Sequence, residues 1–201
     1  MSPEQNAKAE EAIALLRAPE EEITTQLLQI QQDNSLGGYL VGLDHRIKGA
    51  GRLKEKLVDE LKNDIGASIA DAAEQINDAV RYTFCFGIGE YLNGYHYVRQ
   101  RLESAGYEMT YSKNHWLDDP DYKGINSRWK TPDGARFEMQ FHIPDSFYAK
   151  EFLTHCSYDR LRTPGTNWQE RVELESYQRT VSTAVPQPYG VATVIDRKER
   201  F

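Results

Sequence analysis

Three hydrogen-bonding side chains alternate along one short segment of the chain. In the run "FEMQFH", Glu138, Gln140 and His142 stand at every second position, with apolar side chains between them. Neighbouring side chains of a β-strand point to opposite faces, so the pattern predicts a strand with one polar and one apolar face. The simplest interpretation is a sheet face exposed to solvent. The alternative is a site that binds a metal ion and a polar ligand.

A second carboxylate precedes another predicted strand. Asp78 lies just before "AVRYTFCF", where β-branched and aromatic residues predict a strand. If the two strands lie in one sheet, Asp78 and Glu138 can face one cleft. Two carboxylates in a cleft suit Mg²⁺, which prefers oxygen ligands and keeps water molecules that phosphate oxygens can replace. We therefore predict that these two residues hold Mg²⁺.

Basic residues gather upstream, in a chain whose formal net charge is −7. One interpretation is a solvated helix start with ordinary charge mixing. The other is a clamp for a polyphosphate, in which arginine makes paired contacts and lysine supplies a point charge. Spacing alone favours neither. The residues are Arg46, Lys48, Arg52, Lys54 and Lys56.

A glycine-led loop could complete such a site. "YKGINS" offers Gly124 for close backbone approach, and Asn126 and Ser127 as hydrogen-bond donors. A carboxylate pair with Mg²⁺, a basic clamp and a polar loop are together typical of phosphoryl-group transfer. The sequence contains neither a Walker-type glycine loop nor the protein-kinase motifs.

Periodicity predicts the elements that must position these residues. A helix follows a capping box of Ser2 and Gln5, and a second follows Pro19. Asp145 is expected to cap a helix that is broken at Pro164. Further helices are expected over 51–66, 90–106, 145–162 and from 168 through 181, and strands over 79–89, 107–116, 122–130 and 135–142, with an extended tail from 186.

This order of elements predicts an α+β domain with a mixed β-sheet core and flanking helices. We expect N-terminal helices over 1–40, a core over 41–163, and a C-terminal helix and tail over 164–201 that pack on the same domain. The length of 201 residues and a hydrophobic content of 39% support one such domain with helical additions, or a small pair of domains.

Composition also restricts the class of protein. The negative net charge argues against a general nucleic-acid binder. Cys85 and Cys156 form no metal motif, and they could be buried thiols or one disulfide. No apolar run approaches the roughly 18 residues of a membrane span. The acidic N-terminal segment lacks the apolar core of a signal peptide, so we expect a cytosolic chain or a mature or excised part of an exported one.

In their order and separation, these motifs resemble the synthetase domain of the RelA/SpoT alarmone family. The resemblance covers roughly residues 40–162, through "RIKGAGRLKEK", "NDAVRYTF", "SKNHWLDDPDYKGINS" and "FEMQFH". The matching positions are Arg46, Lys48, Lys56, Asp78, Lys113, Gly124, Ser127, Glu138, Gln140 and His142.

The resemblance implies an enzyme of nucleotidyltransferase-like fold that moves the β,γ-pyrophosphate of ATP to the 3′-hydroxyl of a second nucleotide. Asp78 and Glu138 would hold Mg²⁺, Glu138 would accept the hydroxyl proton, and Gln140 would help to orient the acceptor. The remaining nucleotide-binding residues would be Arg46, Lys48, Arg52, Lys56, Arg81, Lys113, Lys123, Gly124, Asn126, Ser127 and His142.

Two positions depart from the family pattern. The family carries an arginine five residues after the metal aspartate, where this chain has Thr83, whereas Arg81 lies only three residues after Asp78. The family also carries a base-stacking tyrosine where this chain has Ile125. We predict that Ile125 contributes to a preference for adenine over guanine as the acceptor base.

The segments "RYT", "YKGIN" and "FEMQFHIPDSFYAKE" resemble the adenine-directed branch of the family, which includes secreted enzymes and toxin domains. This implies ATP as donor, AMP, ADP or ATP as acceptor, a (p)ppApp product and a possible cognate immunity protein. The alternatives are a guanine-directed synthetase, a toxin that modifies the 3′ end of tRNA, and a non-catalytic nucleotide-binding module. The chain lacks the motif of the family's hydrolase half, so it would make the product without removing it.

Overall fold

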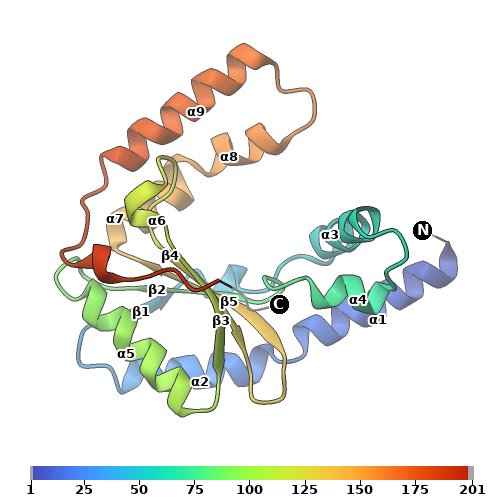
Figure 1. Cartoon of the computed structure of the whole chain (residues 1–201), viewed down its shortest axis with the longest axis horizontal. Helices are drawn as coiled ribbons and strands as arrows, with labels where there is room; N and C mark the ends of the chain where they lie inside the picture. Colours follow the sequence, from blue (N-terminus) through green and yellow to red (C-terminus); the bar gives the residue numbers. More distant parts are fainter. Residues whose placement is uncertain (1, 199–201) are drawn as a thin grey trace.

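A mixed sheet of five strands forms the centre of the computed structural model, which describes residues 2–198 (Figure 1). The strand order is β1-β2-β5-β4-β3. β2 and β5 run parallel, and the other neighbouring pairs run antiparallel. This confirms the predicted α+β class with a mixed sheet. The strands are β1 Tyr39–Val41, β2 Arg81–Cys85, β3 Glu108–Asn114, β4 Ile125–Lys130 and β5 Arg136–His142.

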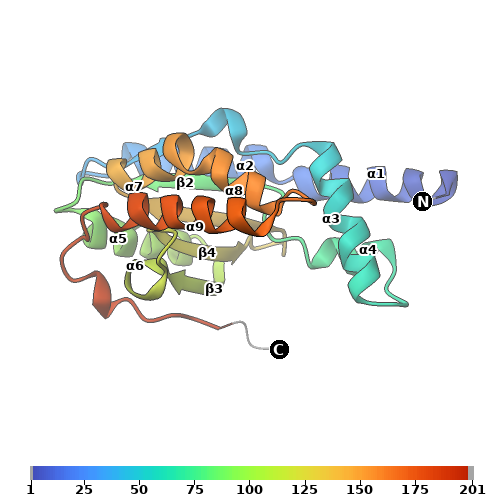
Figure 2. The ribbon, with the colours of Figure 1, turned by 90° about the horizontal axis from the view of Figure 1, so that it is seen from above.

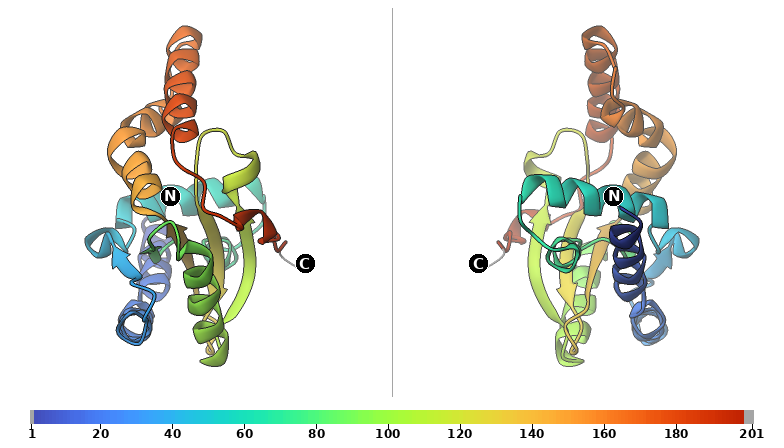
Figure 3. Two further views of the ribbon diagram at one scale, coloured as in Figure 1. Left: turned by 90° about the vertical axis from the view of Figure 1, so that its left-hand side faces the viewer. Right: turned by 90° about the vertical axis from the view of Figure 1, so that its right-hand side faces the viewer.

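Helices lie on both sides of this sheet. α2 and α5 lie on one side, and the α8–α9 pair projects from the other (Figures 1, 2 and 3). The helices are α1 Pro3–Arg17, α2 Glu20–Gln32, α3 Ala50–Asn63, α4 Ile69–Glu74, α5 Tyr91–Ser104, α6 His115–Asp118, α7 Pro144–Tyr148, α8 His155–Arg162 and α9 Trp168–Thr183, with short turns η1 Leu43–His45, η2 Ala149–Leu153 and η3 Val191–Thr193.

The apolar face of β5 belongs to the main hydrophobic core. Phe137, Met139 and Phe141 are fully buried, as the alternating pattern predicted. They share this core with Leu27 of α2 and Val98 of α5. Burial of a large apolar side chain contributes about 1.5–3 kcal/mol, so this face fixes the strand register.

A second, smaller core joins α1, α3 and α4. Leu53 and Leu57 of α3 are fully buried there against Ile13 of α1. The four-residue spacing of the two leucines places them on one side of α3. Lys56 directly precedes Leu57, and its ammonium group contacts Asp78. This packing therefore positions part of the predicted basic clamp.

The segment 145–162 differs from the single helix that was predicted. It contains α7, the π-helical turn η2 and α8. The predicted cap is also wrong, because α7 begins at Pro144 and Asp145 lies within its first turn. The hydroxyl of Ser146 accepts a hydrogen bond from the Ile143 backbone N–H at 3.1 Å. β1 and α4, two elements that were not predicted, are also present.

Both cysteines are free thiols, so the disulfide alternative is not observed. Cys85 is buried in β2, and Cys156 is exposed on α8. The tail from Pro186 is less extended than predicted, because it contains η3 and then pairs Arg197 with Ser112 of β3. Within the described residues, no helix has both the length and the apolar character needed to cross a bilayer.

Candidate active site

The candidate site lies on the polar face of the sheet, where β5 is flanked by β2 and β4. The parallel register pairs Glu138 with Arg81, and the antiparallel register pairs Gln140 with Asn126. The polar face of β5 is exposed to solvent over only part of its length. Gln140 is 4% exposed, and His142 is fully buried. Helix α7 and the turn η2 cover this end of β5 through contacts of Ser146 and Lys150.

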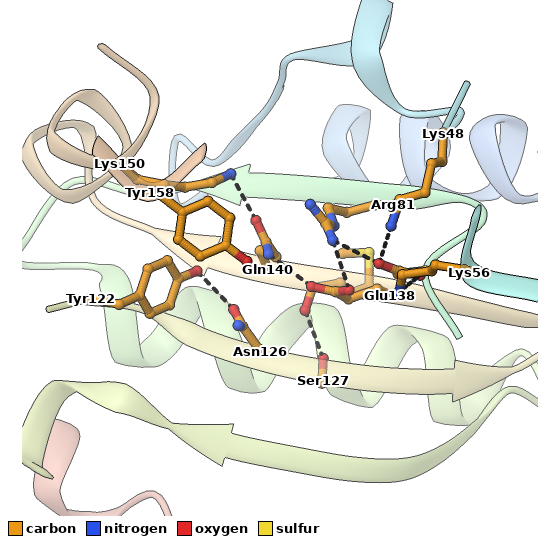
Figure 4. Close-up of polar contacts among 12 residues, drawn as sticks. Lys48, Lys56, Arg81, Tyr122, Asn126, Ser127, Glu138, Gln140, Lys150 and Tyr158 are labelled. Carbon is orange, nitrogen blue, oxygen red and sulfur yellow. Dashed lines mark hydrogen bonds and ion pairs between the residues drawn. The ribbon is translucent and has the colours of Figure 1, made fainter. Parts of the chain in front are cut away.

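Asp78 and Glu138 both contact one guanidinium group, that of Arg81. Figure 4 shows Arg81 beside Glu138, with Lys48 and Lys56 nearby. The Nη2 atom of Arg81 donates to Asp78 Oδ2 at 3.1 Å and to Glu138 Oε2 at 3.3 Å. Lys56 Nζ donates to Asp78 Oδ1 at 2.7 Å, and Lys48 Nζ contacts Asp78 Oδ2. The structure thus joins both predicted carboxylates with three of the predicted basic residues.

Ion pairing dominates the electrostatics of Asp78. Burial by itself would raise the pKa of this carboxyl, but the hydrogen bonds and charges of Lys48 and Lys56 lower it to about 2. Burial lowers the pKa of Lys48 in turn. Asp78 is therefore ionised at neutral pH and surrounded by cations.

Backbone pairing holds the basic segment against the sheet. Lys48 N–H donates to the Ala79 carbonyl at 2.9 Å, and Arg81 N–H donates to the Arg46 carbonyl at 2.8 Å. An antiparallel β-bridge joins Ile47 to Val80, just before β2 begins. A short stretch of strand-like pairing therefore delivers Lys48 to Asp78.

The carboxylate pair fits Mg²⁺. Both side chains accept a hydrogen bond from the same nitrogen of Arg81, so the two carboxylates line one site. Within residues 2–198, no group of three or more His, Cys, Asp and Glu side chains could hold a metal ion. Mg²⁺ commonly takes only one or two carboxylates and completes its octahedron with water and substrate phosphates. The donor set of Asp78 and Glu138 matches that preference.

Gln140 connects Glu138 to a lysine that sequence reasoning missed. Gln140 Nε2 donates to Glu138 Oε1 at 2.8 Å, and Lys150 Nζ donates to Gln140 Oε1 at 2.9 Å (Figure 4). Lys150 belongs to η2, where the Thr154 N–H reaches the Ala149 carbonyl at 2.9 Å. The single helix predicted over 145–162 gave no reason to select this residue.

His142 is buried, and both nitrogens of its ring contact protein groups. Its Nδ1 atom lies 2.9 Å from the Ser146 hydroxyl, and its Nε2 atom lies 2.8 Å from the Tyr122 hydroxyl. Tyr122 donates to Asn126 Oδ1 at 2.8 Å. Burial lowers the pKa of His142 well below its usual value, so the ring is neutral. The protein itself thus engages both ring nitrogens, and a contact of His142 with a nucleotide stays a prediction.

Two other residues face the core instead of the site. Ile125 is fully buried opposite Phe141, so the prediction that it selects the acceptor base is wrong. Ser127 donates to the Met139 carbonyl at 3.2 Å and accepts from Trp129 Nε1 at 2.9 Å. Alternation along β4 explains both corrections, because only Asn126 between them points to the polar face.

The glycine-led loop packs closely against β5. A Cβ atom at Gly124 would lie 3.0 Å from His142 Cε1 and 3.0 Å from the Phe141 carbonyl oxygen. The close approach predicted for this glycine is thus to the protein itself. Lys123 donates to the carbonyl groups of Trp116 and Asp119 at 3.2 and 2.7 Å, which stabilises the loop.

Three further predicted residues also lack a contact with Asp78 or Glu138 among the described interactions. Arg46 pairs with Glu20 of α2. Arg52 pairs with Glu55, and its side chain is 73% exposed. Lys113 is exposed on β3. Their contacts with a nucleotide stay predictions.

No family model matches the sequence, and no curated protein matches it either. Solved structures do match. Small alarmone synthetase 1 from Bacillus subtilis, bound to its product pppGpp, has a TM-score of 0.60 and 12% identity over 88% of this chain and 92% of that one. The Type VI effector Tas1, solved with its immunity protein, has a TM-score of 0.54 and 20% identity over 87% and 96%.

A GTP pyrophosphokinase family protein from Streptococcus pneumoniae gives a similar result. Its TM-score is 0.55, with 12% identity over 91% of this chain and 90% of that one. At such low sequence identities, the structural similarity is evidence of a shared fold. It agrees with the resemblance carried by the motifs around Lys48, Asp78 and Glu138. This chain has the fold of the RelA/SpoT-type alarmone synthetases.

Proposed function

We propose that this chain is an ATP-dependent nucleotide 3′-pyrophosphokinase. The observation that carries the proposal is the convergence of Asp78 and Glu138 on Arg81, with Lys48 and Lys56 on the Asp78 carboxylate. The cluster combines two oxygen ligands for a divalent cation with three cations for phosphate oxygens. It lies on a sheet whose fold is that of the alarmone synthetases.

The reaction assigns a distinct task to each group. The 3′-hydroxyl oxygen of the acceptor attacks the β-phosphorus of ATP, the bond from that phosphorus to the oxygen bridging the α-phosphate breaks, and AMP leaves. Glu138 accepts the hydroxyl proton. Lys48, Lys56 and Arg81 neutralise phosphate charge, which is the main form of catalysis available in such transfers.

Mg²⁺ would be held by Asp78 and Glu138. When bound, it would neutralise and orient the phosphate oxygens of ATP. In the structure, Lys48 and Lys56 supply the positive charge beside Asp78. With Mg²⁺ bound, Lys48 and Lys56 would lie at the edge of the phosphate-binding site. Loss of either carboxylate should therefore weaken both metal binding and transfer.

We propose adenine nucleotides as acceptors, giving (p)ppApp. This part rests on the resemblance of "RYT" and "YKGIN" to the adenine-directed branch, since Ile125 lies in the core. A guanine-directed synthetase is the second candidate. The pppGpp-bound structure favours it, because that synthetase gives a TM-score of 0.60 against 0.54 for Tas1. Modification of tRNA is disfavoured by the net charge of −7, since phosphate contacts supply much of the affinity for nucleic acid.

One assay tests the activity and names the acceptor. The protein is incubated with ATP, Mg²⁺ and each of AMP, ADP, GMP, GDP and GTP, and the products are separated by chromatography; ATP alone tests ATP as acceptor. Equimolar formation of AMP and a pyrophosphorylated nucleotide supports the proposal. Glu138→Gln serves as the inactive control. Binding of ATP with no product from any acceptor would instead identify a nucleotide-binding module.

We extend the proposal to an effector role with a cognate immunity protein. Support comes from the likeness to Tas1, whose structure contains a Type VI effector and its immunity protein. An unregulated synthetase would deplete ATP and ADP in a recipient cell. The test is induced expression in a bacterial host, with nucleotide pools measured against the Glu138→Gln variant. Equal growth and equal pools for both proteins would contradict this extension.

A further inference from the structure

We infer that Lys150 is a positioning residue that fixes the Glu138 carboxylate through the side chain of Gln140. The inference rests on the proposed function, because it assigns Glu138 a role in the transfer. Lys150 donates to Gln140 Oε1 at 2.9 Å, and Gln140 donates to Glu138 Oε1 at 2.8 Å. The three side chains form one continuous relay of hydrogen bonds (Figure 4).

The ammonium group of Lys150 determines which way the Gln140 amide faces. An ammonium group only donates hydrogen bonds, and an ionised carboxylate only accepts them. The Gln140 carbonyl oxygen must therefore face Lys150, and its NH₂ group must face Glu138. With the amide flipped, the Gln140 NH₂ group would face the Lys150 ammonium group, so that two donors would meet. The Gln140 carbonyl oxygen would face the Glu138 carboxylate, so that two acceptors would meet. Lys150 thus removes the choice between two amide orientations.

This orientation holds both oxygens of the Glu138 carboxylate. Gln140 contacts Oε1 at 2.8 Å, and Arg81 contacts Oε2 at 3.3 Å. The Glu138 side chain is 15% exposed, so little water is available to replace either donor. A carboxylate that binds a metal ion or accepts a proton works best when its neighbours fix it in place.

The fold places Lys150 for this task in a specific way. The residue belongs to the π-helical turn η2, and such turns inside helices are often found at functional sites. Its ammonium group lies 3.5 Å from Glu151 Oε2 and 5.7 Å from the centroid of the Phe147 ring. The side chain is only 23% exposed. These contacts hold the ammonium group in the one direction that meets Gln140.

A double-mutant cycle tests the inference against direct nucleotide binding by Lys150. The kcat and the KM for each nucleotide are measured for wild type, Lys150→Met, Gln140→Ala and the double variant. Each single variant should lose roughly 10- to 100-fold in kcat, the usual effect of removing a supporting partner. Both KM values should change little. The double variant should lose no more than the worse single variant, because one relay is broken in each.

Two results would overturn the inference in an active wild type. One is unchanged kcat with a raised KM in Lys150→Met, which would make Lys150 a substrate ligand. The other is a double-variant loss equal to the product of the two single losses. Lys62→Met is the matched control, since Lys62 is 69% exposed and pairs only with Asp59 among the described contacts. It should keep wild-type kcat.

Thermal melting of every variant separates a loss of folding from a loss of activity. If Lys150→Met does not fold, the cycle is repeated with Lys150→Arg, which keeps the charge but moves the donors. A partial kcat loss that disappears in the Gln140→Ala background supports the relay, and an independent loss refutes it. A wild type that makes no product with any acceptor contradicts the proposed function instead.

Discussion

The two ends of β5 carry similar polar residues but have different environments. At one end, Glu138 contacts Arg81 and keeps 15% of its side chain exposed. Arg81 also contacts Asp78, to which Lys48 and Lys56 bind. At the other end, His142 is fully buried, neutral and bonded to Tyr122 and Ser146. One alternating pattern thus yields a charged site at one end and a structural hydrogen-bond chain at the other. The difference comes from what covers each end, because α7 closes over His142 and leaves Glu138 at the rim.

The largest expected effect is at the charged end. Glu138→Gln should lower kcat by roughly 100-fold or more, because the base and one metal charge disappear while the shape is kept. ATP should still bind, and the melting temperature should change little. The measurement is steady-state transfer with ATP binding by calorimetry. Near-normal turnover would remove Glu138 from the mechanism, and neither end of β5 would then have a role in catalysis.

A pH series tests the ionic character of the same end. The pKa of Asp78 is lowered from 3.8 to about 2, so its ion pairs stabilise the fold fully above pH 3.8 and are lost as the pH falls through about 2. The pH-dependent part is about 2 kcal/mol. Urea unfolding of wild type and Asp78→Asn should give free energies whose difference shrinks over this range. A difference that stays constant with pH would show that Asp78 is not ion-paired in solution.

Tyr122→Phe should show the opposite behaviour at the buried end. The variant leaves His142 and Asn126 without their shared partner, which should lower the free energy of unfolding by about 1–2 kcal/mol. The kcat of the folded protein should change far less than in Glu138→Gln. The two quantities are measured by urea denaturation and by the transfer assay. A large kcat loss at unchanged stability would place Tyr122 in the chemistry.

The smallest effect is expected at the surface of α3. Arg52→Ala removes an exposed pair with Glu55, which should change stability by less than about 1 kcal/mol. Lys56→Ala should raise the KM for ATP more than Arg52→Ala, because Lys56 contacts Asp78 and Arg52 does not. The KM for ATP in both variants checks this order. A larger rise in the KM for ATP in Arg52→Ala than in Lys56→Ala would place the ATP phosphates nearer to Arg52.

The sequence by itself determined the local features of this protein. Period-two alternation predicted β5 and its buried Phe137, Met139 and Phe141. The expectation that Asp78 and Glu138 face one cleft depended on both strands lying in one sheet, and in the structure both carboxylates contact Arg81. The predicted helices and strands match most of the observed elements for the same reason, since periodicity and capping are properties of neighbouring residues. Arg81 was harder to place, because its role depends on both carboxylates at once.

Only the tertiary structure decided which polar residues line the candidate site and which bind to other parts of the protein. The parallel pairing of β2 with β5 sets Arg81 opposite Glu138, and α7 seals His142. The π-helical turn η2 directs Lys150 to Gln140, although its residues read as ordinary helix. These outcomes depend on strand order and on helices that return from distant parts of the chain. Local periodicity contains no information about such long-range packing, so the sequence could name the polar residues without assigning each its partner.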